Sequence, residues 1–582
     1  MSINNFFSAF VVGLFRWMDG SLFFRGMTKF FDFIKNVCAG SFIVGLFTGS
    51  EDPESSNKSI FAKIFDKILN GLPKFITLPE TWPSLLSDLA RGSWFINSVS
   101  SSLNTPIPAP FRGSGGLIRW VFFALPMWVL AMVVFATPVL PTMILAGMLM
   151  LVLVFVLFSR HFVIDNLAVF LLLFIIVNMI AGFLSLTPQT SIQIALLTSV
   201  FVMSTMVIVA CCNTRESVDM FFMLFIAGAT IAGLIGVYQH LVGYTAVAAW
   251  VDRDLHPELH NRLISTFGNP NVYGTCLLLA IPLAAAMIVY TKRFLFKLMA
   301  FGITGLLLLN LLLTYSRGCY LALALAVGIF ILIIEKRFIV LMIPLLLAVP
   351  FLIPDTMWMR ILSIFNTEDT STAFRLFIWQ GSLRVIGDFW MVGIGQGIEA
   401  YSRVYPYYGL AAIYSPHSHN LFFQVFIELG IVGLLTFLGL LACFFRAMST
   451  FIRNVTEFKL KVVAVAMIAA VIGFLFQGIF DYVFYNYRVL LTFYVFLGLG
   501  IAFTKVHGIQ KSVVKNNAPI LVTGYNDLDF IEDIEEAEEV EEFEELEELE
   551  EAEGIEEFVE CYETNDLEEL EEMEELEPND DK

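Results

Sequence analysis

Long apolar segments alternate with short polar ones between about residue 118 and residue 504. A helix needs roughly 17 to 25 mostly apolar residues to cross the hydrocarbon core of a bilayer. The chain offers twelve such segments, at residues 118–136, 139–158, 163–184, 190–211, 218–240, 271–291, 295–314, 318–334, 338–354, 419–445, 461–480 and 487–504. The pattern therefore predicts an all-α polytopic membrane protein with about 12 transmembrane helices.

The segments before and after this region have a different pattern. In residues 1–115, short apolar runs are broken by charges and glycines, and residues 60–69 alternate apolar and charged positions at helical spacing. That spacing is typical of a helix lying in the membrane interface. We therefore divide the chain into an N-terminal cytoplasmic or interfacial amphipathic region (1–115), a transmembrane domain (116–505) and a C-terminal tail (506–582).

Basic residues gather in every second loop between the predicted spans. They include Arg160, Arg215, Lys292, Arg293, Lys336, Arg337, Arg446 and Arg453. Loops rich in lysine and arginine stay on the cytoplasmic side of a membrane. This distribution predicts that both termini are cytoplasmic. It also places two long loops outside, at 241–270 and 355–418, the second between the ninth and tenth spans. A loop of 64 residues is longer than a connection requires, so we expect it to have a function.

The net charge of −20 hides two opposite regions. Of the 54 acidic residues, 31 lie from Asp527 onward together with one lysine, which leaves 23 acids against 33 bases before that point, a charge of +10. The tail repeats two glutamates and one apolar residue. A three-residue period gives no persistent helical face, and neighbouring glutamates repel, so the tail is predicted to be disordered at neutral pH. The alternative is an arm that docks a basic cytoplasmic partner.

Neither the cysteines nor the acidic pairs indicate a metal site. The seven cysteines are scattered, mostly within apolar segments, and their spacing does not match that of metal ligands. They are predicted to be buried thiols. Asp252 and Asp254 have the spacing of a metal-binding Asp-x-Asp pair, but a three-residue match in a chain of this length is a weak signal. We predict no metal.

Three polar residues enter the tenth span. His419 and Asn420 stand at its mouth, and Glu428 follows nine residues after the histidine. Polar groups that enter lipid usually face a cavity and mark a function. A histidine can act as a general base, although a histidine at a helix end is often only a satisfied polar residue. His417 lies two residues earlier and is a second candidate for the same role.

Three arginines of the outer loops and helix ends lie in acid-poor surroundings: Arg262, Arg317 and Arg375. A guanidinium group can bind a phosphate through two hydrogen bonds. Arg375 and Trp379 are four residues apart, so they share a face if this segment is helical. Tryptophan and the loop tyrosines suit sugar rings. The alternatives are that Arg317 reaches the membrane interface by snorkelling and that the tyrosines form an interfacial belt.

Together these elements resemble the bacterial O-antigen ligase/polymerase family. The resemblance covers roughly 118–504 and includes the layout of twelve spans with one large outer loop. The motifs that carry it are Arg262 with Asn269-Pro270-Asn271, Ser316-Arg317-Gly318, Arg375 with Trp379, Gly393-x-Gly395-x-Gly397, and His419-Asn420-x9-Gly430-x-x-Gly433. The last of these is the specific one.

The resemblance implies a metal-independent glycosyltransferase of surface polysaccharide biosynthesis that needs no cofactor. Its donor would be an undecaprenyl-pyrophosphate-linked glycan and its acceptor a glycan or lipid-glycan, with no nucleic acid involved. The reaction would take place at the outer face of the bacterial cytoplasmic membrane. By resemblance, His419 is the catalytic base and Arg375, Arg262 and Arg317 bind the donor pyrophosphate. The supporting residues are Asn420, Glu428, Trp379 and His417.

Two other classes of function compete with this interpretation. A transporter or flippase of lipid-linked saccharides is expected to carry internal repeats and ionisable residues near the membrane midplane. Here the repeats are not evident, and the ionisable residues cluster at the outer edge. A non-catalytic membrane scaffold would leave the arginine-rich outer loops unexplained. We therefore expect chemistry at the outer leaflet.

Overall fold

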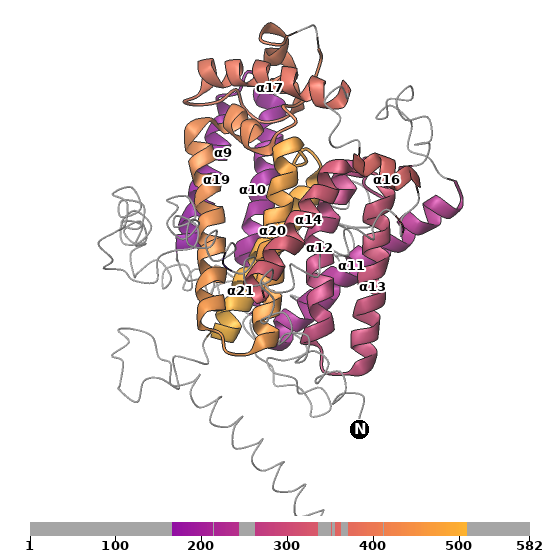
Figure 1. The fold of residues 1–582 in the computed structure, drawn as a ribbon. Helices are drawn as coiled ribbons and strands as arrows, with labels where there is room; N and C mark the ends of the chain where they lie inside the picture. The colour runs from indigo at the N-terminus through magenta and orange to yellow at the C-terminus, as the bar shows by residue number, and fades with distance from the viewer. Residues whose placement is uncertain are drawn as a thin grey trace, which may run out of the picture. The chain divides into compact units, whose positions relative to one another are not determined.

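The computed structural model describes Lys29 and residues 166–212, 215–243, 262–335, 351, 355–362, 370–410 and 413–508. This part of the chain is all-helical and contains no strand. Nine of its helices are long and apolar enough to cross a membrane. They are α9 (Asn166–Phe183), α10 (Pro188–Cys211), α11 (Arg215–Leu241), α12 (Pro270–Tyr290), α13 (Phe294–Leu313), α14 (Arg317–Ile334), α19 (Leu421–Asn454), α20 (Phe458–Phe480) and α21 (Tyr487–Gly508) (Figure 1).

These nine helices correspond to nine of the twelve predicted spans. The other three, at 118–136, 139–158 and 338–354, fall outside the described residues, apart from residue 351. So do the amphipathic region at 60–69 and the acidic tail. The largest difference in length concerns α19, which continues to Asn454 instead of ending near residue 445.

The predicted outer loop at 355–418 is largely helical where it is described. It contains α16 (Asp355–Leu362), α17 (Thr370–Phe389), α18 (Ile398–Val404) and a 3-10 turn at Tyr405–Tyr407. In Figure 1, α17 lies across one end of the helix bundle. Tyr401 and Tyr405 stack with ring centroids 5.1 Å apart and are buried. These two tyrosines therefore belong to the small core of this region, and form neither a sugar groove nor an interfacial belt.

The membrane helices pack through apolar and small side chains. Helix α20 lies against α12 and α14, while α10 lies against α9 and α21. Gly473 of α20 allows close approach, because a Cβ atom there would lie 3.1 Å from the carbonyl oxygen of Ala322 in α14. Small residues at such crossings are the usual means by which membrane helices associate. The buried thiols predicted at Cys212, Cys276 and Cys319 are confirmed.

Several loops and helix ends meet at one end of the bundle, which we call the loop end: residues 184–187, 262–269, 314–316, 390–410, 413–420 and 481–486. Backbone hydrogen bonds join Leu186 to Ile394 and Leu263 to Leu313 across it. Asn269 begins α12, as its Asn-Pro sequence predicts, and its side chain accepts hydrogen bonds from the first turn. The loop end thus gathers segments that are far apart in the sequence.

Helix α19 is broken at Gly430. Its φ of 68° and ψ of −170° lie in a region open essentially only to glycine. A neighbouring segment replaces the helical hydrogen bonds that are lost there: the amide of Ile394 donates to the carbonyl of Ile427 at 2.8 Å, and that of Gly395 to the carbonyl of Glu428 at 3.1 Å. Inside a membrane such groups must be satisfied within the protein, so the break and the segment depend on each other.

The two backbones approach too closely for side chains at the crossing. Ile431, just after the break, donates its amide to the carbonyl of Trp390 at 2.8 Å. A Cβ atom on Gly393 would lie 2.8 Å from the amide nitrogen of Gly430, and a Cβ atom on Gly430 would collide with the carbonyl oxygen of Met391. This crossing gives a physical reason for Gly393 and Gly430, the first glycine of each of the two glycine-containing motifs.

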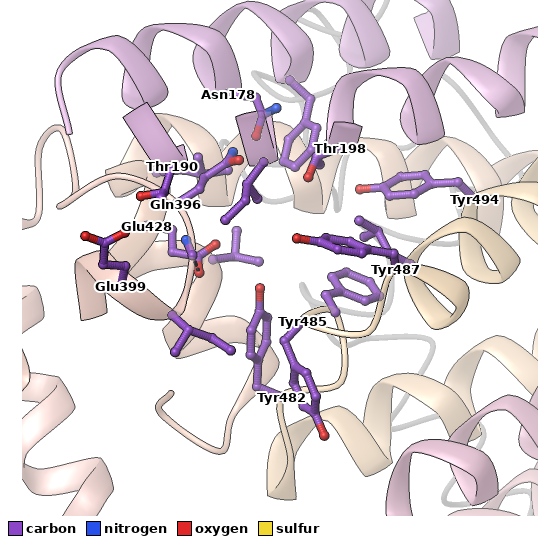
Figure 2. A pocket seen from close by; sticks show the side chains of 18 residues that line it. Asn178, Thr190, Thr198, Gln396, Glu399, Glu428, Tyr482, Tyr485, Tyr487 and Tyr494 are labelled. Carbon is purple, nitrogen blue, oxygen red and sulfur yellow. Dashed lines mark hydrogen bonds between the residues drawn. The ribbon is translucent and has the colours of Figure 1, made fainter. Parts of the chain in front are cut away.

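Glu428 lies two residues before the break and is buried. Its Oε1 accepts a hydrogen bond from the side-chain amide of Gln424 at 3.0 Å and one from the amide of Gly397 at 3.3 Å, and it is also hydrogen-bonded to Tyr482. These groups satisfy the carboxyl group by hydrogen bonds. Glu428 faces a cavity between the helices (Figure 2).

Replacing Gly430 by alanine should destabilise the protein by about 1–3 kcal/mol, because alanine is strained in this conformation and its Cβ meets backbone. The matched control is Gly305→Ala in α13, where a Cβ atom has no described neighbour within 4 Å. That change should be neutral or slightly stabilising. Thermal unfolding of the purified full chain in detergent measures both, and equal melting temperatures would contradict the role assigned to the break.

Candidate active site

His419 is held at the loop end from two sides. Asn420 caps α19 by accepting a hydrogen bond from the amide of Phe423 at 3.0 Å, and its own amide group donates to the carbonyl of Ile479 at 2.9 Å. Trp379, on α17, donates its indole N–H to the carbonyl of His419 at 3.3 Å. The histidine backbone has a φ of 50°, a left-handed conformation that is uncommon for this residue type. His419 is thus placed jointly by α17, α19 and the end of α20.

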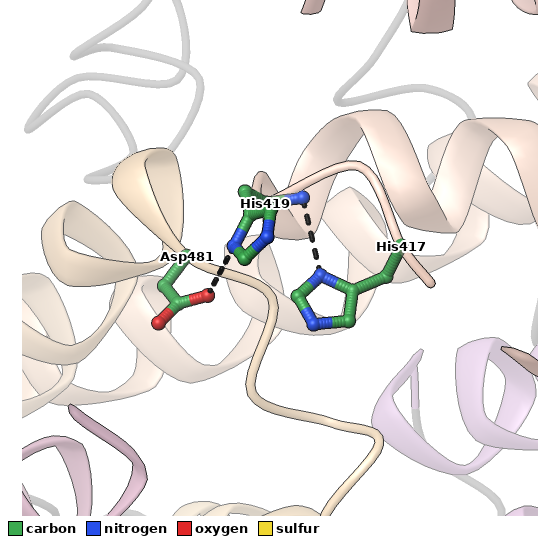
Figure 3. Close-up of side chains that lie close together, drawn as sticks. All are labelled: His417, His419 and Asp481. Atoms are coloured by element: carbon green, nitrogen blue, oxygen red, sulfur yellow. Dashed lines mark hydrogen bonds and ion pairs between the residues drawn. The ribbon is translucent and has the colours of Figure 1, made fainter. Parts of the chain in front are cut away.

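The imidazole of His419 faces a carboxylate from another helix. Its Nδ1 lies 3.1 Å from Oδ1 of Asp481, the residue directly after α20 (Figure 3). The histidine side chain is 21% exposed, whereas that of Asp481 is only 7% exposed. A carboxylate that accepts the Nδ1 proton leaves Nε2 with a lone pair. This pair has the arrangement by which a carboxylate orients a histidine base.

Asp481 is itself held in the ionised form. Its Oδ1 accepts a hydrogen bond from the amide of Tyr482 at 2.9 Å, and its Oδ2 accepts one from the side chain of Asn271 at 3.3 Å. Burial raises the pKa of Asp481. The hydrogen bond and charge of His419, together with the charge of Arg375, outweigh burial and hold this pKa below the ordinary range. The carboxylate is therefore a permanent negative charge beside the histidine.

His417 packs against the dyad of His419 and Asp481. Its ring centroid is 4.2 Å from that of His419, and its Nδ1 accepts a hydrogen bond from the amide of His419 at 3.3 Å. On the other side it stacks on Tyr485 at 5.1 Å. Burial, and then the neighbouring His419 and Arg375, lower the pKa of His417 to about 3. His417 is therefore neutral at physiological pH.

The three predicted pyrophosphate ligands occupy different places. Arg262 is 7% exposed, and it donates to the carbonyl of Thr314 at 2.8 Å and to the side chain of Asn271 at 3.0 Å. Since Asn271 also donates to Asp481, Arg262 connects to the dyad through one residue. Arg317 is half-buried and begins α14 at the same end of the bundle.

Arg375 and Trp379 lie on one helix, α17, so the condition under which their spacing of four residues places them on one face is met. The charge of Arg375 is among the causes that lower the pKa of Asp481 and of His417, so its guanidinium lies near both residues. The structure thus brings His417, His419, Asn420, Trp379 and Arg375 into one site. Glu428 is separate, since eight helical residues after Asn420 correspond to about 12 Å along the axis.

The three residues His417, His419 and Asp481 also have the residue types of a metal site. Each residue offers one ligand atom, and the three atoms lie within 4.8 Å of one another. Imidazole and carboxylate groups suit a cation such as Zn²⁺. However, Nδ1 of His419 already pairs with Oδ1 of Asp481, and Nδ1 of His417 accepts an amide proton. A cation bound through either Nδ1 would have to displace one of these hydrogen bonds.

Asp481 is the functional candidate that sequence reasoning missed. It follows an apolar span in the sequence Phe480-Asp481-Tyr482. An ionisable residue at the border of lipid calls for a partner, and this rule, which singled out His419 and Glu428, applies equally to Asp481. Its pairing with a histidine 62 residues away in the chain could not be read from that pattern.

Fold and site together define the class: a multi-pass helical membrane protein with a histidine–carboxylate pair at one end of its bundle. Residues 302–438 match the family model described as O-antigen ligase. This stretch, which contains His419, Arg317 and Arg375, belongs to the O-antigen ligase family. The match supports a glycosyltransferase-like membrane enzyme of polysaccharide biosynthesis. A search of curated proteins finds no match. Arg262 and Asp481 lie outside the matched stretch.

The low pKa of His417 predicts a pH-dependent stability. The ordinary value is 6.5 and the folded value about 3, so the unfolded chain binds more protons between these limits. Stability should therefore rise with pH across this window and fall as the pH drops toward 4. In a His417→Asn variant, melting temperatures measured from pH 4 to 7 should depend less on pH. The control is His240→Asn, because His240 is exposed near the end of α11. If the melting temperatures of the wild-type protein and both variants had the same dependence on pH, the effect of burial on His417 would be contradicted.

Proposed function

We propose that this protein transfers a glycan from an undecaprenyl-pyrophosphate carrier to a hydroxyl group, with His419 as the general base. The observation that carries the proposal is the pairing of His419 with Asp481, which directs Nδ1 to a buried carboxylate and leaves Nε2 for an acceptor. The family match supports a reaction of the ligase or polymerase type. A glycan and a lipid-glycan both supply the required hydroxyl.

In this reaction Nε2 of His419 takes the proton of the acceptor hydroxyl as its oxygen attacks the anomeric carbon of the donor. The bond from that carbon to the pyrophosphate oxygen breaks, and the pyrophosphate leaves with the electron pair. Asp481 stabilises the imidazolium that forms, as the carboxylate does in a catalytic triad. The base then loses its proton to solvent, which restores the starting state.

The leaving pyrophosphate develops negative charge, which a fixed cation can stabilise. Arg375 is the strongest candidate because its charge already acts on Asp481 and His417. Arg317 begins α14 at the same end and is a second candidate. We assign Arg262 to the donor site as well, and its bonds to Thr314 and Asn271 indicate that it also positions the dyad. Arginines in these places would let the reaction proceed without a metal.

The location follows from the charge pattern of the loops. Lysine and arginine gather in the loops opposite the loop end, which favours a cytoplasmic location for those loops and for both termini. The dyad would then face the outer side of the bacterial cytoplasmic membrane, where lipid-linked glycans are used. The competing function, a flippase of lipid-linked saccharides, needs an ionisable site near the midplane. The dyad instead stands at helix ends, which favours transfer over transport.

Replacing His419 by alanine should abolish transfer, and Asp481→Asn should lower the rate by about 10²- to 10⁴-fold, as expected when a carboxylate no longer orients its histidine. The measurement is transfer by purified protein from lipid-linked glycan extracted from the producing cells, together with surface polysaccharide on a gel. His240→Ala is the control for loss of a histidine. Full activity of a folded His419→Ala protein would rule out the proposed base.

Replacing Arg375 by glutamine should reduce transfer by about 10²- to 10³-fold, the usual effect of removing one stabilising donor from a developing oxyanion. The matched control lies on the same helix: Arg384 is exposed, and Arg384→Gln should leave transfer unchanged. Arg375→Lys should recover only part of the rate, because lysine lacks the forked geometry. Equal rates for the two glutamine variants would remove Arg375 from the donor site.

A further inference from the structure

A cavity of about 260 Å³ lies between the helices behind the dyad. It is bounded by α9, α10, α19 and α21, by residues 396–399, and by the link between α20 and α21. Its described lining contains no lysine or arginine, and its polar groups are amides, hydroxyls and the carboxylates of Glu399 and Glu428. A site of this composition does not suit a pyrophosphate. It suits a neutral ligand that carries several hydroxyl groups.

Three buried polar atoms of the lining have no hydrogen-bond partner in the described part of the chain: Oδ1 of Asn178, Oε1 of Gln396 and the hydroxyl of Tyr494. The three side chains are 0%, 3% and 1% exposed. A buried polar group without a partner costs about 1–3 kcal/mol, and native proteins rarely leave several together. Their convergence on one cavity indicates that a bound molecule supplies the missing partners.

The orientation of these groups defines the chemistry of that molecule. The amide nitrogen of Asn178 is engaged with the carbonyl of Ala195 at 2.7 Å and with Ser199 at 3.1 Å, so its oxygen is left for the cavity. Figure 2 shows the hydroxyls of Tyr487 and Tyr494 pointing into the same space from the opposite side. The ligand must therefore donate hydrogen bonds on one side and exchange them with hydroxyls on the other.

We propose that this cavity binds one sugar ring of the glycan that the enzyme transfers or extends. A sugar ring combines hydroxyl groups, which the unpaired atoms require, with C–H faces that pack on tyrosine rings. The volume is slightly below the roughly 300–1,000 Å³ of sites for drug-sized ligands, which fits a single ring. This assignment rests on the proposed function, and it names a binding site away from the reacting atoms.

The cavity communicates with the dyad through two tyrosines. Tyr482 and Tyr485 line it, and both rings contact His417, with centroids 5.7 and 5.1 Å from the histidine ring. His417 in turn contacts His419. A sugar in the cavity therefore lies one layer of side chains behind the base. It would belong either to the donor glycan or to the acceptor glycan, and both have the same hydroxyl chemistry.

Tyr494→Phe tests the proposal, because it removes a hydroxyl that has no partner in the described structure. The empty protein should melt at the same or a higher temperature. If a sugar binds there, KM should rise roughly two- to tenfold, as expected for one lost hydrogen bond, while kcat stays nearly constant. A rise in KM for the lipid-linked donor identifies the donor glycan, and a rise for the acceptor identifies the acceptor glycan.

The matched control is Tyr405→Phe. The hydroxyl of Tyr405 is also buried without a described partner, but the residue lies outside the cavity lining. Its removal should change neither KM. Gln396→Leu is a second cavity variant and should act like Tyr494→Phe. Unchanged KM values for both substrates in both cavity variants would show that the cavity holds water only, and would overturn the proposal.

A binding measurement keeps this result separate from the proposed function. Methyl glycosides of hexoses and N-acetylhexosamines, added to the full chain in detergent, should raise the melting temperature of the wild-type protein and of Tyr405→Phe more than that of Tyr494→Phe. Inorganic pyrophosphate should not reproduce this difference. A melting shift without any transfer activity would retain the sugar site while refuting the transfer reaction. Equal shifts in all three proteins would refute the sugar site.

Discussion

The exchange of backbone hydrogen bonds at Gly430 is the constraint on which the rest of the site depends. A helix cannot break inside a membrane unless other groups satisfy its free carbonyls and amides. The segment at 390–397 does this, and so joins the loop region to the middle of α19. The same join brings the amide of Gly397 to Glu428. It also keeps α17 close enough for Trp379 to bond the backbone of His419.

The dyad is assembled from helix ends that lie far apart in the sequence. His419 precedes α19 and Asp481 follows α20, while Asn271, at the start of α12, links the carboxylate to Arg262. The C-terminal end of a helix disfavours a negative charge. The ionised state of Asp481 therefore rests on His419, Arg375 and its hydrogen bonds, rather than on the helix that carries it.

Hydropathy was sufficient to predict nine membrane helices, because a span is a local property of about twenty residues. The cap at Asn269 was also predictable from its local Asn-Pro sequence, whereas the helix that carries Arg375 and Trp379 lies in a segment that was predicted as a loop. The pairing with Asp481, the crossing at Gly430 and the cavity were not predictable. Each depends on contacts between segments separated by dozens of residues, which neither periodicity nor motif spacing specifies. The glycine motifs were recognisable in the sequence. Only the structure shows that two backbones approach there too closely for a Cβ atom.

The break at Gly430 divides α19 into two parts that contact different regions of the protein. Residues 421–429 are bonded to the loop region, whereas the later part continues through the bundle, where Phe437 packs on Phe174 of α9 with ring centroids 6.2 Å apart. The loop region and residues 421–429 therefore form one structural unit. Its boundary lies within α19, at Gly430, and not at residue 420, where the helix begins. A chimera that exchanges this unit between relatives keeps its matched backbone contacts only if the junction is placed at Gly430.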